Sequence, residues 1–384
     1  MLPSYCTNIH PAENWEETFH VLKTDVLAVR DGLAQDTAFA GQSFPIGLRL
    51  SALAAEELLA NQGVELQIFI DWLAAENCHV FTINGFPYGA FHGTSVKEKV
   101  YQPDWTTPER LHYTKQLFTI LAAILPSHMS GSVSTLPASF KAFGADESII
   151  FSQLEECAEF IEDLSFETGL DLHLGLEPEP LGHFENTEET IAFFQRLFAA
   201  AKDADVVREF IGVNFDTCHF AIEFDQAGQA LSQLQKHDIK ISKIHLSSAL
   251  SFNPNDPAGL EKISQFNEPT YLHQVITRGP EGQLNRYADL PDYLRARQLG
   301  QHDVKANEAR VHFHIPVYAE PEAPLSSTMQ TLKETLSWCK EHPDACQHFE
   351  IETYTWGVLP NNLQQGLTQQ IISEFRHIIQ LMEG

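Results

Sequence analysis

The chain has 384 residues, of which 43% are hydrophobic and 20% charged, a composition typical of a globular protein with a large core. Its 24 Lys and Arg residues stand against 52 Asp and Glu residues, giving a formal net charge of −28, and no basic run is long enough to offset it locally. This charge argues against nucleic acid and anionic membranes as partners, and favours a small-molecule substrate.

The cysteines and the N-terminal residues indicate where the protein acts. The six cysteines form no CxxC pair in this long chain, which is typical of reduced thiols (Cys6, Cys78, Cys157, Cys218, Cys339 and Cys346). The first fifteen residues lack the basic and apolar regions of a signal peptide, and no apolar run reaches the ~18 residues of a spanning helix. We therefore expect a cytoplasmic protein.

Short apolar runs recur along the chain, and longer stretches with helical periodicity lie between them. The strand-like runs are 2–8, 46–50, 78–83, 131–136, 171–177, 211–216, 241–246, 311–317 and 347–353. Helices are predicted at 53–61, 107–125, 147–168, 187–201, 330–341 and 368–383. The second of these opens with Thr107 as N-cap and Pro108 in the first helical position.

Strands that alternate with helices in this way predict parallel strands joined by crossover helices. Eight such units form a (β/α)₈ TIM barrel, which we expect as a single domain over 1–384. An open doubly wound sheet is the alternative, but no Gly-rich fingerprint follows the first strand. Nine runs are present where a barrel has eight strands, so either 311–317 is an extra element or one of the other runs is not a strand. The polar segment 251–309 is expected as a long insertion between barrel strands 7 and 8, acting either as a lid or as an insert without a role in the site.

The ends of the later strands carry ionisable residues. In a TIM barrel the carboxyl ends of the strands surround the active site, so these side chains are expected to converge. Two Glu, one Asp and one His at four strand ends suit a divalent ion such as Mn²⁺, Mg²⁺, Co²⁺ or Zn²⁺. Each of these four residues, taken alone, is explained as well by a helix cap or a salt bridge as by metal binding. The four segments are 175–179, 214–219, 243–246 and 349–354.

This pattern resembles the xylose-isomerase-like superfamily of sugar phosphate isomerases and epimerases. Longer stretches resemble the EboE-type metabolite-traffic proteins within it, namely YCTNIHPAE at 5–13, FTINGFPYG at 81–89, PDWTT at 103–107 and EIETYTW at 350–356. The resemblance implies metal ligation by Glu177, Asp216, His245 and Glu352, and substrate binding by His219. Glu350 shares strand parity with Glu352, which leaves the choice between them open.

Further residues are expected around the mouth of the barrel. His10, Asn84 and His92 lie at or after the ends of the early strands and are candidates for substrate binding. His312 and His314 depart from the superfamily pattern. They are candidates for binding substrate or a second metal, although two histidines on a hydrogen-bonded face would give the same pattern.

The first functional hypothesis is a metal-dependent isomerase or epimerase acting on a sugar or polyol, in which Glu177 and Glu352 exchange a proton with the substrate through an enediolate. The EboE resemblance implies that its metabolite is destined for export. A metal-containing carrier without turnover is the second hypothesis. The third is an endonuclease IV-like phosphodiesterase, against which the charge of −28 argues.

Overall fold

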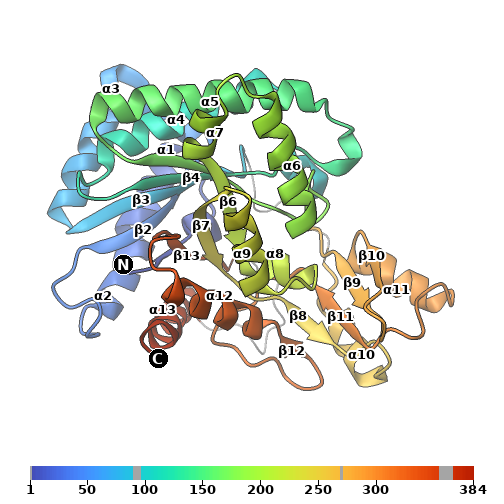
Figure 1. The fold of residues 1–384 in the computed structure, drawn as a ribbon. Helices are drawn as coiled ribbons and strands as arrows, with labels where there is room; N and C mark the ends of the chain where they lie inside the picture. Colours follow the sequence, from blue (N-terminus) through green and yellow to red (C-terminus); the bar gives the residue numbers. More distant parts are fainter. Residues whose placement is uncertain (1, 90–96, 269–270, 354–365) are drawn as a thin grey trace.

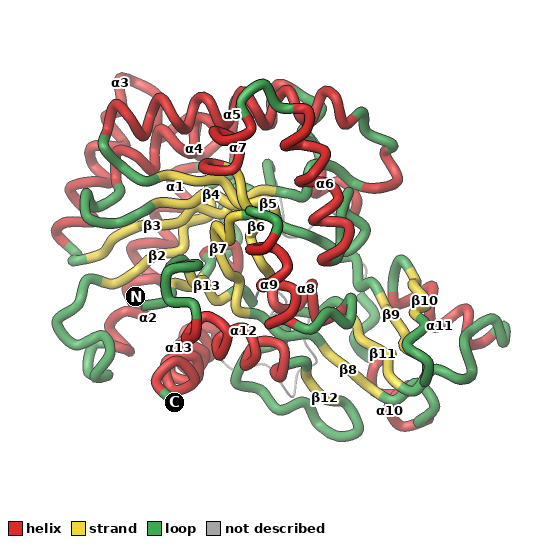
Figure 2. The backbone as a smooth tube through the Cα atoms, in the orientation of Figure 1, coloured by secondary structure: helices red, strands yellow, loops and turns green. Residues whose placement is uncertain are grey.

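The computed structural model describes residues 2–89, 97–268, 271–353 and 366–384. Eight parallel strands form one sheet in the order β1-β13-β7-β6-β5-β4-β3-β2, and a parallel bridge between Cys6 and Gly47 joins its two edges. The predicted (β/α)₈ barrel is therefore confirmed (Figures 1 and 2). Its strands are β1 Ser4–Tyr5, β2 Phe44–Arg49, β3 Cys78–Asn84, β4 Gly131–Thr135, β5 Leu172–Leu176, β6 Ile211–Asp216, β7 Lys240–Leu246 and β13 Phe349–Ile351.

Helices surround this barrel and connect successive strands (Figure 2). They are α1 Trp15–Val21, α2 Leu27–Leu33, α3 Ala52–Ala75, α4 Pro108–Ile124, α5 Glu147–Thr168, α6 Thr187–Ala200, α7 Ala204–Phe210, α8 Thr217–Ile222, α9 Ala227–Lys236, α12 Met329–Glu341 and α13 Leu367–Glu383. α4 begins as predicted, with Thr107 as N-cap and Pro108 in the first turn, but the Thr107 side chain makes no capping hydrogen bond. None of the described helices is long and apolar enough to cross a membrane.

The segment after β7 builds a second, five-stranded sheet beside the barrel, seen in yellow and orange in Figure 1. Its strands are antiparallel: β8 Leu250–Phe252, β9 Val275–Arg278, β10 Leu284–Tyr287, β11 Glu308–Val311 and β12 Ser326–Ser327, with α10 Pro257–Ser264 and α11 Leu290–Gln298 between them. The ninth run in the sequence, 311–317, shares only Val311 with this sheet. The prediction of a strand over 311–317 was wrong, because strand pairing stops at Val311 and the next residues leave the sheet.

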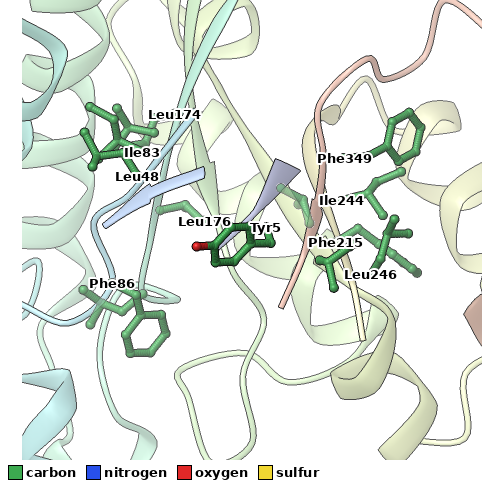
Figure 3. Packing of buried hydrophobic residues seen from close by; sticks show 14 of the residues in the cluster. Tyr5, Leu48, Ile83, Phe86, Leu174, Leu176, Phe215, Ile244, Leu246 and Phe349 are labelled. Carbon is green, nitrogen blue, oxygen red and sulfur yellow. The ribbon is translucent and has the colours of Figure 1, made fainter. Parts of the chain in front are cut away.

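Apolar side chains on the barrel strands pack outward against the helices. Leu48 lies opposite Ile83, and Ile244 lies opposite Phe349, so each pair joins neighbouring strands (Figure 3). These residues belong to one large buried cluster that includes the apolar faces of the helices. Burial of this surface is the main stabilising contribution to the fold.

The inside of the barrel is polar, where branched aliphatic side chains are the rule. On β7, Ile244 and Leu246 join the apolar cluster, whereas Lys243 and His245 bond to side chains of other strands. Lys243 Nζ lies 2.5 Å from Glu350 Oε2, and both side chains are fully buried. The interior thus carries a stack of polar contacts that leads up to the mouth of the barrel.

Candidate metal centre

Four strand ends bring four ionisable side chains together at the mouth of the barrel. Glu177 follows β5, Asp216 ends β6, His245 lies near the end of β7, and Glu352 follows β13. All four are buried, and one ligand atom from each lies within 4.8 Å of the others. β5, β6, β7 and β13 are successive neighbours in the sheet, which is why residues far apart in sequence meet here.

His245 lies at the centre of this group. Its Nδ1 is 3.0 Å from Glu177 Oε1, 3.3 Å from Glu352 Oε2 and 3.6 Å from Asp216 Oδ2. Its other nitrogen, Nε2, lies 2.9 Å from Glu350 Oε2 and donates to that carboxylate. A neutral imidazole that donates through Nε2 carries its lone pair on Nδ1. That lone pair and three carboxylate oxygens form a donor set that fits a divalent cation, with Glu350 orienting the histidine as carboxylates do in metal sites.

The surrounding carboxylates favour a positive charge at this point. Burial alone would lower the pKa of His245, but Glu352 and Glu177 raise it well above its usual value. Burial raises the pKa of Asp216, yet His219, His314 and His245 hold it well below its usual range. The three carboxylates concentrate negative charge in a buried site. Such a site costs several kcal/mol per ion unless a cation balances it.

Neighbouring donors fix one oxygen of each carboxylate and leave the other oxygen facing His245. Asn8 and Asn84 donate to Glu352 Oε1 at 2.8 and 3.2 Å. Asn214 donates to Glu177 Oε2 at 2.9 Å. Asp216 Oδ1 accepts from Ser247 Oγ at 2.6 Å and from two backbone N–H groups at the start of α8, whereas no hydrogen bond to Oδ2 is found among the described residues.

The structure separates Glu350 from Glu352. Glu350 contacts Lys243 and the outer nitrogen of His245, so it lies on the far side of the imidazole from the four-residue group. Gly47 leaves room for it, because a Cβ at this position would lie 1.9 Å from Glu350 Oε1. Glu352, and not Glu350, is therefore the member of the group that β13 positions.

A small cavity of about 70 Å³ opens directly above these residues. Among the predicted residues, Asn84, Glu177, His219, His312 and Glu352 line it, together with Phe86, Tyr101 and Tyr271. Tyr271 comes from the predicted insertion, 251–309, and His312 follows β11, so residues between β7 and β13 cover the mouth. A larger cavity of about 790 Å³ lies at the opposite end of the barrel, where Cys78 and Phe349 begin their strands, and it contains none of the predicted residues.

Two of the remaining predicted residues do not line the cavity, and the third lies outside the described part of the chain. His10 is buried with its Nε2 3.1 Å from the hydroxyl of Tyr5, and it does not line the cavity. His314 is fully buried beside His219 and does not line the cavity. His92 lies outside the described residues.

Several residues of this region were not predicted. Glu179 lines the cavity two residues after Glu177, and Asn214 lies two residues before Asp216. Lys243 lies two residues before His245. Alternate residues of a strand share a face, so counting back by two from Asp216 and His245 would have found Asn214 and Lys243, whereas Glu179 lies beyond the end of β5, where this alternation does not apply.

No protein-family model matches the chain, and no curated protein is similar to it in sequence. Solved structures with a similar fold include a D-psicose 3-epimerase determined in the presence of D-fructose (10% identity, 100% of both chains, TM-score 0.48). Others are the IolI protein with a bound zinc atom (12%, 100% of this chain and 98% of that one, 0.47) and a probable 3-DHS dehydratase from Bacillus anthracis (11%, 99% of both, 0.46). Sequence identities and TM-scores this low carry no information about the site, so the side chains of this chain are the basis for interpreting it.

Proposed function

We propose that the protein is a divalent-metal-dependent isomerase or epimerase of a small sugar or polyol. The observation that carries this proposal is the buried convergence of Glu177, Asp216, His245 and Glu352, within 4.8 Å, at the floor of a cavity. Three carboxylates and one imidazole suit Mn²⁺, Mg²⁺, Co²⁺ or Zn²⁺. A bound divalent ion would supply Lewis-acid polarisation of a substrate carbonyl, which acidifies the neighbouring C–H bond.

Glu177 and Glu352 are the candidates for proton transfer. They follow β5 and β13, and β6 and β7 lie between these two strands, so the two carboxylates flank the group from two sides. Both line the cavity, and each is held by an Asn side chain through one oxygen. One carboxylate would remove the proton and the other would return it, to the neighbouring carbon in an isomerisation or to the opposite face of the same carbon in an epimerisation.

The lining of the cavity favours a small, uncharged, polyhydroxylated substrate. Phe86, Tyr101 and Tyr271 offer apolar faces, whereas Asn8, Asn84 and His219 offer hydrogen bonds. Sugar-sized ligands combine these two kinds of surface. A part in handling a metabolite destined for export is proposed on the sequence resemblance alone.

Hydrogen exchange at carbon tests this proposal whichever product the reaction forms. The metal-loaded protein is incubated in D₂O with a panel of ketohexoses and ketopentoses, and loss of the C–H signal next to the carbonyl is followed by ¹H NMR. We expect exchange with at least one ketose, abolished by chelation and slowed by roughly 100-fold or more in Glu177→Gln and Glu352→Gln. Glu155→Gln, a buried glutamate of α5 away from the mouth, should exchange as the wild type does.

The same experiment separates the enzyme from a carrier. If Glu352→Gln exchanges as fast as the wild type, Glu352 has no part in proton transfer. If the wild type binds a ketose, measured by calorimetry, yet exchanges no proton with any member of the panel, the carrier hypothesis replaces the enzyme.

A further inference from the structure

A buried arginine lies beneath the turn that follows β3. Arg110 stands in the first turn of α4, it has no exposed surface, and its Nη2 finds no hydrogen bond among the residues that the structure describes. Burial lowers the pKa of Arg110 to about 10, so the side chain is still charged at neutral pH. Burial deprives this cation of hydration, and the positive end of the helix dipole repels it. The helix itself therefore gives no reason for an arginine at this position.

The guanidinium of Arg110 donates to three backbone carbonyl groups. Its Nε lies 2.8 Å from the oxygen of Pro103, and its Nη1 lies 2.8 Å from the oxygen of Gly85 and 3.1 Å from that of Phe86. The last two belong to the turn that carries Phe86 into the lining of the cavity above the carboxylates. Gly85 lets this turn pack closely, because a Cβ there would lie 2.5 Å from a methyl carbon of Leu117. Arg110 thus fixes the backbone at the end of β3.

The peptide unit between Gly85 and Phe86 connects Arg110 to the four-residue group. Its carbonyl oxygen accepts from Arg110, and its N–H, on the opposite side of a trans peptide, donates to Asn84 Oδ1 at 3.0 Å. A backbone N–H only donates, so Oδ1 is the amide atom that faces it and Nδ2 is directed elsewhere. That nitrogen donates to Glu352 Oε1 at 3.2 Å. The orientation of the Asn84 amide therefore depends on this peptide unit.

We propose that Arg110 is a positioning residue for the metal centre, which acts through this peptide unit and Asn84 on Glu352. If the Asn84 amide turned over, its oxygen would face Glu352 Oε1, and two acceptors at that distance repel. A charged donor on the carbonyl also polarises the peptide and strengthens its N–H as a donor to Asn84. With Oε1 held in this way, Glu352 Oε2 stays 3.3 Å from His245 Nδ1. The inference rests on the proposed metal centre, since Glu352 is one of its four residues.

A second buried arginine provides a matched control. Arg49 donates through Nη1 to the carbonyl oxygen of Ala12 at 2.5 Å and through Nη2 to that of Gly89 at 2.6 Å, so it holds the far end of the same turn. Neither of these carbonyls belongs to the peptide unit that faces Asn84. Arg49→Met therefore removes a buried guanidinium from the turn without touching the proposed connection, and it measures the effect of a general loosening of the turn.

Metal affinity measures the effect on Glu352. Protein freed of metal by chelation and dialysis is titrated with Mn²⁺ by calorimetry. We expect Arg110→Met to weaken binding about 10-fold or more, as the loss of a side chain that orients a ligand does in metal sites, and Arg49→Met to bind as the wild type does. The double variant of Arg110→Met with Asn84→Ala should bind as weakly as Asn84→Ala alone, because Arg110 acts through Asn84. Losses that multiply in the double variant would overturn this route.

The side-chain NMR signals of Asn84 test the connection in metal-free protein. With ¹⁵N-labelled asparagine, the NH₂ pair of Asn84 is the one missing in Asn84→Ala. We expect this pair to shift towards the values of an exposed asparagine in Arg110→Met and to stay in place in Arg49→Met. Arg110→Lys keeps the charge but not the fork of donors, so it should shift the pair in the same direction, and it decides the question if Arg110→Met does not fold.

The two measurements separate this inference from the metal centre itself. A wild type that binds no Mn²⁺ would overturn the metal centre, and the role of Arg110 with it. A wild type that binds Mn²⁺ with an affinity that Arg110→Met leaves unchanged would overturn the role of Arg110 alone. An Asn84 signal pair that stays in place in both Arg110 variants would do the same.

Discussion

Replacing Lys243 with Met removes one half of an ion pair that lies inside the barrel. Lys243 Nζ is 2.5 Å from Glu350 Oε2 and 3.2 Å from Ser134 Oγ, and the Lys243 and Glu350 side chains have no exposed surface. The substitution leaves the carboxylate of Glu350 buried with His245 as its remaining charged neighbour. Breaking a buried pair in this way costs about 3–5 kcal/mol of unfolding free energy.

Lys240 provides the matched control, because it stands at the start of the same strand. Its Nζ is 3.7 Å from Glu209 Oε1, and its side chain is 28% exposed. Such a pair is worth at most about 1 kcal/mol, so Lys240→Met should change stability little. Urea unfolding followed by circular dichroism, with chelator present so that metal does not contribute, measures both variants under the same conditions.

The double variant Lys243→Met with Glu350→Gln completes the cycle. It removes both buried charges, and the Gln oxygen can still accept from His245 Nε2, so we expect it to be more stable than Lys243→Met alone. The coupling energy should reach about 2 kcal/mol or more. Equal losses in Lys243→Met and Lys240→Met, or a double variant whose loss is the sum of the single losses, would refute this view of the barrel interior.

Three further outcomes follow from individual contacts. Burial raises the pKa of Glu374 to about 7, so the unfolded chain releases this proton first and stability falls as pH rises from about 4.5 to 7. Glu374→Gln should recover roughly 3 kcal/mol at pH 8 and almost nothing at pH 4, measured by urea unfolding at both values. Gly47→Ala places a Cβ against Glu350 and the backbone of Tyr5, and should destabilise by about 1–3 kcal/mol or more in the same assay. Asn84→Ala removes a donor to Glu352 Oε1 and should weaken metal affinity about 10–100-fold by calorimetry, with unchanged affinity contradicting an orienting role.

The barrel was predictable from the sequence because each of its strands is a short apolar run bounded by helical periodicity. The second sheet was not, since β9 and β10 are four-residue strands in a polar segment with Gly and Pro, and they pair only with other parts of the insertion. The run that begins at Val311 resembled a barrel strand because its apolar residues alternate with histidines. Phe313 is indeed buried, but it stacks on His273 of the insertion rather than lying in a sheet.

The four-residue group was predictable for a geometrical reason. Parallel strands of a barrel end at one rim, so the position of Glu177, Asp216 and His245 in their strands was enough to bring them together. The approach of His314 to His219 was not predictable in this way. It depends on how some sixty residues of insertion fold back, which no local pattern specifies.

Anomalous X-ray diffraction from crystals of the protein grown with Mn²⁺ tests the metal centre most directly. We expect a manganese peak within about 2.0–2.6 Å of side-chain atoms of Glu177, Asp216, His245 and Glu352. A fully soaked crystal with no peak at this position, or with His245 Nδ1 turned away from the three carboxylates, would contradict the metal centre.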